Sequence, residues 1–361
     1  CLLYTGTPFP GQSDRMTVRK AVSYDRQSLL RRALSWCRFS LGAAWLLLRM
    51  PRHVPVLVVT NPPLLPLIAC VVGWLRRRPY AVLAWDLYPE HLVAIGGFGD
   101  RNLIVRLWRR VNRSVYRRAR VVITIGHRMA AAIQETAGDK VPIAVIPNWA
   151  DTELLRPIDK TDNAFAQRWN QVGKVTVMYS GNIGATHGAT LIADVAKLLE
   201  GDSRLRFLVI GDGLGRAALK DRIEELGLTN IQLLDYQPWT VVPLSLGCAD
   251  LAFVMQDAVS ARYSVPSKVY SFLAAGSAIL AVTPADSDLH DLVTQHRVGL
   301  AVTEPEAIAI AAAIRGVLDK DGELDRLGRN ARSVSESHFS SKVATEQFRR
   351  GLESMVGGVR Q

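Results

Sequence analysis

The sequence is poor in cysteine, and its few cysteines form no pattern. Its 361 residues contain four cysteines with no CxxC spacing and no accompanying histidine pattern, namely Cys1, Cys37, Cys70 and Cys248. A structural zinc site needs clustered Cys and His ligands, and a disulfide framework needs regularly spaced cysteines. The sequence therefore indicates neither, and we expect no metal ion and a reducing, cytoplasmic compartment.

The sequence also lacks an unbroken apolar run of bilayer length. Residues 28–50 are strongly apolar, but arginines interrupt them, and the uninterrupted part from Leu41 to Leu48 is too short to span a membrane. Residues 54–75 are apolar overall, yet Asn61-Pro62-Pro63 breaks them near the middle. This pattern favours a strand, a loop and a helix over one membrane span.

The first residues show neither an initiator methionine nor the architecture of a signal peptide. Gly6 to Gly11 has the composition of a loop that follows a strand. We therefore expect the sequence to begin inside a domain, without an initial strand and helix and without any glycine-rich loop they carried.

Acidic residues are scarce in the first half of the chain. Residues 1–150 contain 22 Lys and Arg against 7 Asp and Glu, whereas residues 151–361 contain 22 against 26, so the whole excess of positive charge behind the net +11 lies in the first half. Such asymmetry predicts an anionic partner, either a membrane surface or a nucleic acid. No stacking-aromatic or groove-reading motif accompanies it, so we expect no nucleic acid.

Residues 101–118 combine arginines with Leu, Trp, Val and Tyr. This composition is typical of a helix that lies on anionic lipid, where each basic side chain contributes on the order of 1 kcal/mol. Arg109, Arg110, Arg117 and Arg118 are the side chains to which we assign this binding. The alternative is an ordinary helix with one solvated face.

Predicted strands and helices alternate along the whole chain, which is typical of α/β domains with parallel sheets. We predict two Rossmann-like domains whose sheets face each other across a cleft. The first covers residues 1–155 and the second residues 172–340, with a polar linker over 152–172 and a C-terminal helix over 341–361.

The stretch from Tyr263 to Val282 predicts an anion site. A helix that begins near Pro266 or Ser267 would point its free N–H groups and the positive end of its dipole at an anion, and Lys268 would add a full charge. Ser264 belongs to the same turn. The alternative is a purely structural capped helix.

Two glycine-rich turns follow predicted strands of the second domain. Gly181-Asn182-Ile183-Gly184 and Gly211-Asp212-Gly213 would let backbone N–H groups approach a ligand with no Cβ in the way. His187 follows the first turn, where it could donate to a phosphate or only cap a helix. The alternative for the first turn is a tight strand-to-helix connection. The second matches a dinucleotide fingerprint poorly, so we expect no nicotinamide cofactor.

Two carboxylates follow a predicted strand of the first domain. Asp86 and Glu90 lie just past the apolar run 79–85. Open α/β sheets bind ligands at the carboxyl ends of their strands, so both become candidate catalytic residues, together with Lys268.

Asp86-Leu87-Tyr88-Pro89-Glu90, Gly181-Asn182-Ile183-Gly184 and Val265-Pro266-Ser267-Lys268 with Ala274-Ala275-Gly276, in this order, resemble the retaining GT-B glycosyltransferases of family 4. The resemblance extends over residues 1–350. It is strongest to the subgroup that builds bacterial polysaccharides, including fucosamine transferases.

This resemblance implies the GT-B fold and a metal-independent hexosyltransferase without a cofactor, whose donor is a nucleotide-diphosphate sugar, expected to be UDP-linked. It implies that Lys268, its helix N-terminus and the turn at Gly181 bind the diphosphate. The second glycine turn and Gln237 would flank the nucleoside. Asp86 and Glu90 would lie on the acceptor side.

The sequence departs from the family at two positions. Many members have a glutamate that holds the ribose and another eight positions earlier near the sugar, where this chain has Ser271 and Tyr263. Either the ribose and sugar contacts of this subgroup differ, or this chain has reduced activity.

We predict an enzyme that moves a sugar to a lipid-linked acceptor in cell-surface polysaccharide synthesis. It would bind peripherally to the cytoplasmic face of the inner membrane. Two alternatives remain, a nucleotide-sugar 2-epimerase and a non-catalytic protein that binds membrane surfaces through its basic half.

Overall fold

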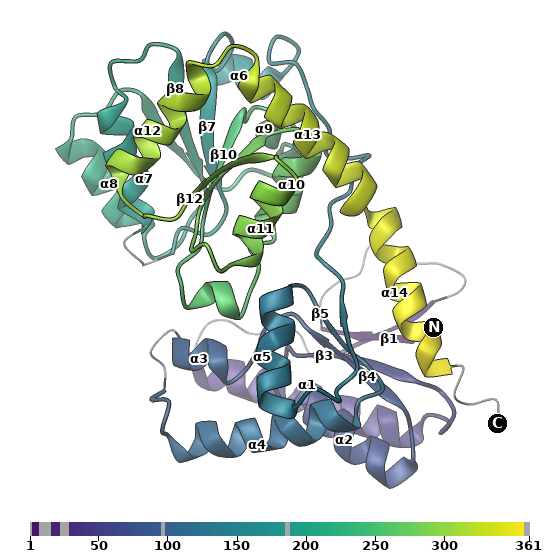
Figure 1. The fold of residues 1–361 in the computed structure, drawn as a ribbon. Coiled ribbons are helices and arrows are strands. Elements are labelled where there is room, and N and C mark those ends of the chain that lie inside the picture. The colour runs from purple at the N-terminus through teal and green to yellow at the C-terminus, as the bar shows by residue number, and fades with distance from the viewer. Residues whose placement is uncertain (1, 7–15, 22–28, 95–97, 185–187, 357–361) are drawn as a thin grey trace. The chain divides into compact units, whose positions relative to one another are not determined.

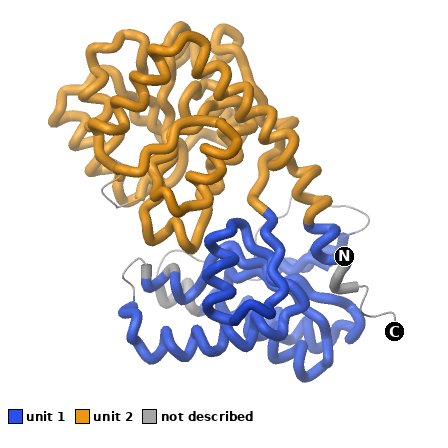
Figure 2. The backbone as a smooth tube through the Cα atoms, viewed as in Figure 1, with its two compact units in different colours: residues 1–146, 348–361 blue, residues 147–347 orange. Residues whose placement is uncertain are grey.

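The computed structural model describes residues 2–6, 16–21, 29–94, 98–184 and 188–356 (Figure 1). The chain forms two compact α/β units (Figure 2). Unit 1 contains residues 1–146 and 348–361, and unit 2 contains residues 147–347. The division therefore falls at Pro147, whereas the sequence predicted a first domain that extends to residue 155.

The segment 152–172, which we expected to be a linker, packs against unit 2. Asn163 is fully buried, and its amide nitrogen donates a hydrogen bond to the Leu244 carbonyl at 2.8 Å. Lys160 forms an ion pair with Asp250. Some of the polar side chains that suggested a linker, Asn163 and Lys160 among them, are thus bonded to distant parts of the unit, which sequence composition does not reveal.

Unit 1 is built on a four-stranded, all-parallel sheet in the order β3-β4-β5-β6. A separate parallel pair joins β1 to β2. The strands are β1 (Leu2–Thr5), β2 (Thr17–Lys20), β3 (Val56–Val59), β4 (Tyr80–Ala84), β5 (Val122–Thr124) and β6 (Ile143–Val145). The expected strand and helix within residues 54–75 are confirmed as β3 and α2, and the Pro-rich break separates them.

The helices of unit 1 pack in a row, in which α1 contacts α2, α2 contacts α4, and α4 contacts α5. Strands that follow one another in the sheet with right-handed crossovers place their connecting helices on one face. The unit 1 strands also carry a core of buried side chains that includes Leu83 and Ile123. Phe348 and Leu352, from the C-terminal part of the chain, pack against this core. The helices are α1 (Leu29–Arg49), α2 (Leu65–Arg76), α3 (Glu90–Ala94), α4 (Leu103–Arg118) and α5 (His127–Ala137).

Unit 2 contains a six-stranded parallel sheet in the order β12-β11-β10-β7-β8-β9. Chain order reverses between β7 and β10, as in a doubly wound Rossmann sheet. The strands are β7 (Val175–Ser180), β8 (Leu205–Ile210), β9 (Ile231–Leu234), β10 (Leu251–Met255), β11 (Ala278–Val282) and β12 (Gly299–Val302). The predicted fold class, α/β with parallel sheets, is confirmed.

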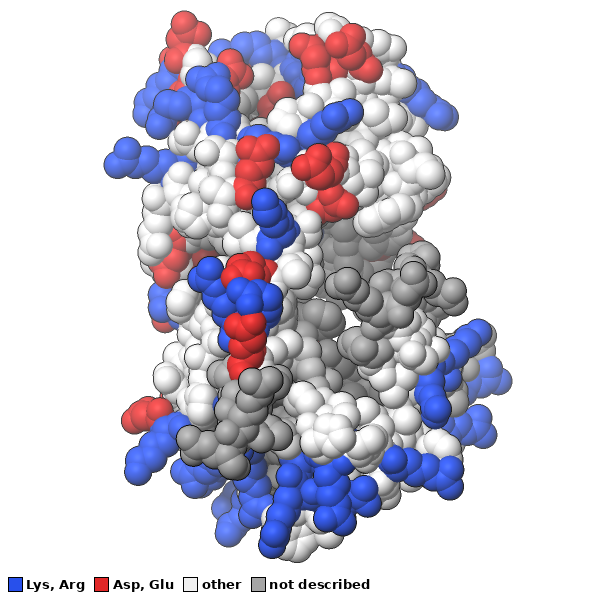
Figure 3. Space-filling model, turned by 90° about the vertical axis from the view of Figure 1, so that its right-hand side faces the viewer, with Lys and Arg blue, Asp and Glu red and all other residues white. Residues whose placement is uncertain are grey.

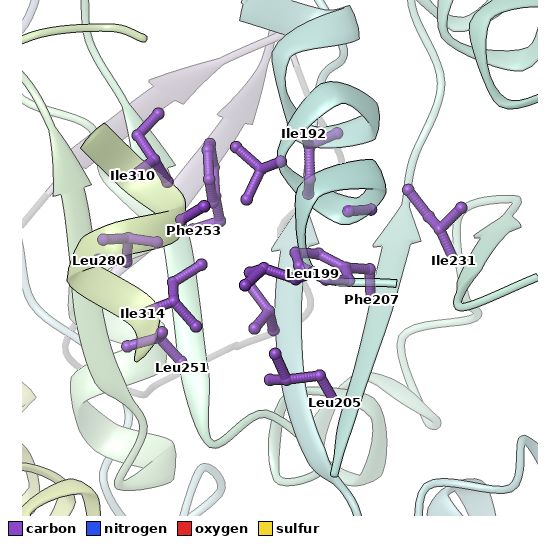
Figure 4. Close-up of a cluster of buried hydrophobic side chains, with 14 of the residues drawn as sticks. Ile192, Leu199, Leu205, Phe207, Ile231, Leu251, Phe253, Leu280, Ile310 and Ile314 are labelled. Atoms are coloured by element: carbon purple, nitrogen blue, oxygen red, sulfur yellow. The ribbon is translucent and has the colours of Figure 1, made fainter. Parts of the chain in front are cut away.

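Helices cover the unit 2 sheet, and those on one face enclose its main core. Phe207 and Phe253 project from the central strands toward Ile192 of α7 and Ile310 of α12 (Figure 4). The helices are α6 (Ala164–Arg168), α7 (Gly188–Leu198), α8 (Arg216–Glu225), α9 (Val242–Leu246), the 3₁₀ turn η1 (Ser260–Arg262), α10 (Lys268–Ala275), α11 (Asp288–Gln295), α12 (Ala307–Leu318) and α13 (Glu323–His338). Helix α14 (Ser341–Val356) begins in unit 2 and ends in unit 1.

One arginine fixes the C-terminal end of α10. The guanidinium of Arg332 on α13 donates to the carbonyls of Ala274 and Leu155, each at 2.7 Å. Gly276 ends α10 with φ 79° and lies against Pro157. These contacts tie the end of α10 to α13 and to the segment at Leu155 and Pro157.

None of the helices within the described ranges has both the length and the apolarity needed to cross a bilayer.

Candidate functional site

Helix α10 begins directly at Lys268. Ser267 occupies the N-cap position, but its side chain makes no capping hydrogen bond. The N–H groups of Val269 and Tyr270 donate to the carbonyls of Pro266 and Ser267 at 3.2 and 3.3 Å. The predicted start near Pro266 or Ser267 is thus confirmed. Fewer N–H groups remain for an anion than a fully open helix end would offer.

The Lys268 ammonium lies beside the turn that follows β7. Its Nζ is 3.7 Å from the centroid of the Tyr179 ring, and a Cβ built on Gly181 would lie 3.4 Å from that Nζ. No hydrogen bond or ion pair joins Nζ to another described residue. Burial lowers the pKa of Lys268 to about 8. The fold therefore keeps a desolvated cation without a carboxylate, which is the arrangement expected at a site that binds an anion.

The two glycine turns lie against each other at the carboxyl ends of β7 and β8. The Gly181 N–H donates to the Ile210 carbonyl at 2.9 Å, and the Ile183 N–H donates to the Asp212 carbonyl at 2.9 Å. A Cβ on Gly211, where φ is +151°, would lie 1.9 Å from the Gly181 carbonyl oxygen. Only glycine permits this approach of two backbones.

Tyr179 connects the first glycine turn to the lysine. Its hydroxyl donates to the Asn182 carbonyl at 2.6 Å, while its ring supports the Lys268 ammonium. Burial raises the pKa of Tyr179, so the hydroxyl stays protonated and keeps donating. No motif in the sequence singles out Tyr179, although its position before Gly181 at the end of a strand is a usable signal.

A cavity of about 160 Å³ lies next to Lys268. An apolar cavity of roughly 150 Å³ is large enough for a benzene ring. Lys268 and Ser271, one turn apart on α10, both line it, so the two face the same space. The remaining lining residues are Ser180, Ile210, Tyr236, Gln237, Val242, Ser245, Leu246 and Phe272. Gln237 was predicted from the sequence, whereas α9 was not, because a helix of five residues is too short for a clear periodic pattern.

The other expected donor-side residues have local roles or fall outside the site as described. Asp212 accepts the Gly213 N–H at 2.8 Å, and the Ser264 hydroxyl donates to the Ser260 carbonyl at 3.0 Å. Gly184 is the last described residue before a gap, and His187 lies outside the described residues.

The two departures from the family pattern differ in their surroundings. Ser271 lines the cavity, at the position that the resemblance gives to the ribose ligand. Tyr263 is not among the lining residues; its ring lies under the Arg262 guanidinium at 5.9 Å.

Asp86 and Glu90 belong to unit 1. The Asp86 N–H donates to the Thr60 hydroxyl at 3.2 Å. Glu90 is largely buried and forms an ion pair with Arg109 at 3.1 Å. Arg109 also pairs with Asp100 at 2.7 Å. Glu90 is therefore held by a neighbouring cation, a contact that sequence spacing did not predict.

Within the described ranges, no three His, Cys, Asp or Glu side chains gather as potential metal ligands. The absence of a metal requirement stays a prediction of the sequence.

The chain pairs a doubly wound α/β unit with a second parallel α/β unit and has a cation and two glycine turns at the switch point. Its fold is that of the GT-B glycosyltransferases. Residues 160–334 match the family described as glycosyl transferases group 1, and residues 3–149 match the glycosyl transferase 4-like domain. Together the two models cover most of the chain, which therefore belongs to these glycosyltransferases.

Two curated relatives carry related names. The chain is 27% identical over 300 residues to the probable glycosyltransferase WbjE of Pseudomonas aeruginosa, covering 83% of this chain and 74% of that protein. It is 28% identical to the putative colanic acid biosynthesis glycosyl transferase WcaI of Escherichia coli, covering 71% of this chain and 62% of that protein.

Among solved structures, HepE of Anabaena in complex with UDP-glucose has a similar fold. The TM-score is 0.72 at 16% identity, and the match covers 98% of this chain and 99% of HepE.

Proposed function

We propose that this glycosyltransferase transfers a sugar, with retention of configuration, from a UDP-linked donor to a lipid-linked acceptor in cell-surface polysaccharide synthesis. One observation carries the proposal. The Lys268 ammonium, without a carboxylate partner, lies between a glycine turn and a ring-sized cavity at the switch point of the sheet. Ligands of open α/β sheets bind at such switch points.

In this proposal the donor spans the cavity and the lysine. The nucleobase or ribose enters the space between Gln237 and Ser271, and the diphosphate lies against Lys268 and the backbone of Gly181. A charge-assisted hydrogen bond of this kind contributes roughly 1.5–3 kcal/mol. Lys268 supplies positive charge directly, so the proposal requires no metal ion.

The proposed transfer breaks the bond between the sugar C1 and the diphosphate oxygen. A bond from the acceptor oxygen to the same face of C1 forms, and the acceptor proton passes to the leaving diphosphate. Negative charge grows on the diphosphate as the bond breaks, so Lys268 stabilises the transition state more than the ground state.

Four observations support the details of donor, pathway and acceptor. HepE, with a similar fold, binds UDP-glucose, and the name of WcaI refers to colanic acid biosynthesis. The resemblance to fucosamine transferases makes a UDP-linked amino sugar the first donor to test. The basic charge of the first half of the chain supports an acceptor at an anionic membrane, which we propose to be the cytoplasmic face of the inner membrane.

A thermal-shift panel tests the donor class. We expect UDP and one UDP-sugar to raise the melting temperature, because ligand at 100 times its dissociation constant stabilises a protein by about 2.7 kcal/mol. Nucleotides with other bases serve as controls. If no nucleoside diphosphate shifts the transition, the proposed function is wrong.

Incubation with the donor alone separates a transferase from the alternative 2-epimerase. A transferase leaves the sugar configuration at C2 unchanged without an acceptor, whereas an epimerase changes it. Nuclear magnetic resonance of the recovered donor measures this. A C2 epimer would decide against the transferase.

Substitution of Tyr179 tests how the lysine charge is maintained. A cation over an aromatic ring is stabilised by roughly 0.5–2 kcal/mol, so Tyr179→Leu should lower the pKa of Lys268 by up to about 1.5 units. UDP affinity should fall at the pH values at which Lys268 loses its proton. We therefore expect the fall in affinity to begin at lower pH in Tyr179→Leu than in the wild type. Calorimetric titration between pH 6.5 and 9.5 measures the shift, using about six pH values.

Tyr179→Phe is the matched control. It keeps the ring and removes only the hydroxyl bonded to Asn182, so the pH at which affinity declines should stay that of the wild type. An identical pH profile for the Leu and Phe variants would show that the ring does not support the ammonium.

A further inference from the structure

The outer surface of the helix row in unit 1 carries large apolar side chains. Five exposed residues of α1 recur at spacings of three and four, which places them on one helix face. They are Leu34, Arg38, Leu41, Trp45 and Leu48. Leu41 is 70% exposed and Trp45 is 51% exposed, while the opposite face of α1 buries Ala43 and Leu46.

The neighbouring helices continue this surface. On α2, which packs beside α1, Trp74 is 67% exposed and Val71 and Leu75 are also exposed. On α4, which packs beside α2, Leu103 and Leu107 are exposed. We call the exposed faces of α1, α2 and α4 the three-helix surface. Contiguous apolar surface on adjacent elements marks an interaction site.

The charge of the three-helix surface has one sign. The sequences of α1, α2 and α4 contain arginines but no Asp or Glu. Arg38, Arg106 and Arg110 are exposed beside the apolar side chains. Figure 3 shows Lys and Arg gathered along the lower rim of unit 1, with uncharged surface between them.

The arginines named from the sequence divide into two kinds. Arg109 is paired with Glu90 and Asp100, and the Arg117 guanidinium donates to the Ala137 carbonyl at 2.6 Å. These two serve the fold. Arg110 and Arg118 are exposed, and no hydrogen bond or ion pair joins either side chain to another described residue. Fewer arginines of α4 are therefore available to an anionic partner than the sequence suggested. The positive charge of the surface is instead spread over three helices.

From these observations we infer that the three-helix surface docks onto an anionic lipid bilayer. Exposed indoles suit the membrane interface, and interspersed arginines pair with lipid phosphates. A second copy of the chain fits worse, because two such faces would oppose arginine to arginine without a carboxylate between them. The inference adds a membrane-docking surface to the proposed function. It rests on that function only in taking the acceptor to be lipid-linked.

Vesicle flotation of the full chain without nucleotide tests the docking. Wild-type protein should float with phosphatidylcholine vesicles that contain about one third phosphatidylglycerol, and much less with phosphatidylcholine alone. Trp45→Ser combined with Trp74→Ser should reduce partitioning roughly tenfold. Arg106→Gln combined with Arg110→Gln should reduce partitioning by a similar factor. High salt should reduce the partitioning of the wild-type protein in the same way.

A matched control replaces exposed residues of the same kinds in unit 2. Ile308→Ser combined with Arg329→Gln should float like the wild type. All variants should keep the wild-type melting temperature and UDP affinity, because the substituted side chains are exposed and none lines the cavity. UDP binding therefore reports on the proposed function separately from the docking.

Two results would overturn the inference. One is a wild-type protein that does not float with anionic vesicles, or that floats equally well after both double substitutions. The other is a wild-type dimer in sedimentation velocity that the Trp45→Ser and Trp74→Ser substitutions convert to monomer, which would make the surface a contact between copies.

Discussion

Replacing Lys268 by Met is expected to lower kcat/KM by about 10² to 10³, because it removes one preorganised charge from the leaving diphosphate. The same variant should be more stable than the wild type. Burial lowers the pKa of Lys268 to about 8. The folded state therefore disfavours the charged form, and relief of this cost should add on the order of 1–3 kcal/mol to the free energy of unfolding at pH 7. Urea unfolding and initial-rate kinetics measure the two effects.

The pH dependence of this stability has a definite sign. Below about pH 8 the lysine is charged in both folded and unfolded protein, and the full cost of burying it is present. Between pH 8 and the ordinary lysine pKa, the unfolded chain binds the proton while the folded protein does not, so stability rises with pH. The advantage of Lys268→Met over the wild type should shrink across this interval.

Lys220→Met is the control for Lys268→Met. Lys220 is exposed on α8, 3.6 Å from Glu224, so its loss should change neither activity nor stability by more than about 0.5 kcal/mol. A Lys268→Met enzyme with near-wild-type turnover would refute the assignment of the diphosphate to this lysine. Loss of activity with loss of stability would instead indicate damage to the fold.

Replacing Gly211 by Ala is expected to abolish UDP binding and to destabilise unit 2 by roughly 2 kcal/mol or more. The new methyl group would lie 1.9 Å from the Gly181 carbonyl oxygen, so the two glycine turns would have to separate. Because Gly181 lies against Lys268, the same movement distorts the proposed phosphate site. Calorimetric titration with UDP and chemical denaturation measure the two losses.

Gly173→Ala separates backbone strain from the steric clash. Gly173 also has a positive φ, +70°, but a Cβ there meets nothing within 4 Å. It should cost about 1 kcal/mol and leave UDP binding unchanged. If Gly211→Ala behaved like Gly173→Ala, the close contact of the two turns would not matter for the site.

Local patterns in the sequence predicted the parts of the fold that depend on neighbours along the chain. The strand and the helix expected on either side of Asn61-Pro62-Pro63 are β3 and α2, and the helix expected to begin near Pro266 or Ser267 is α10, which Gly276 ends. Strand patterns and glycine caps act within a few residues, so they are visible without the fold. The segment 152–172 was misassigned because its polar residues are satisfied by distant partners.

The sequence by itself determined the α/β class, the two glycine turns, the lysine at the start of α10 and the basic charge of the first half. Only the tertiary structure brought Tyr179 under Lys268, added α9 to the cavity wall, paired Arg109 with Glu90 and packed α2 between α1 and α4. The physical reason is separation along the chain. Tyr179 and Lys268 meet because β7 and β10 are neighbours at the switch point of the sheet, and the order of strands in a sheet is not encoded by any local pattern.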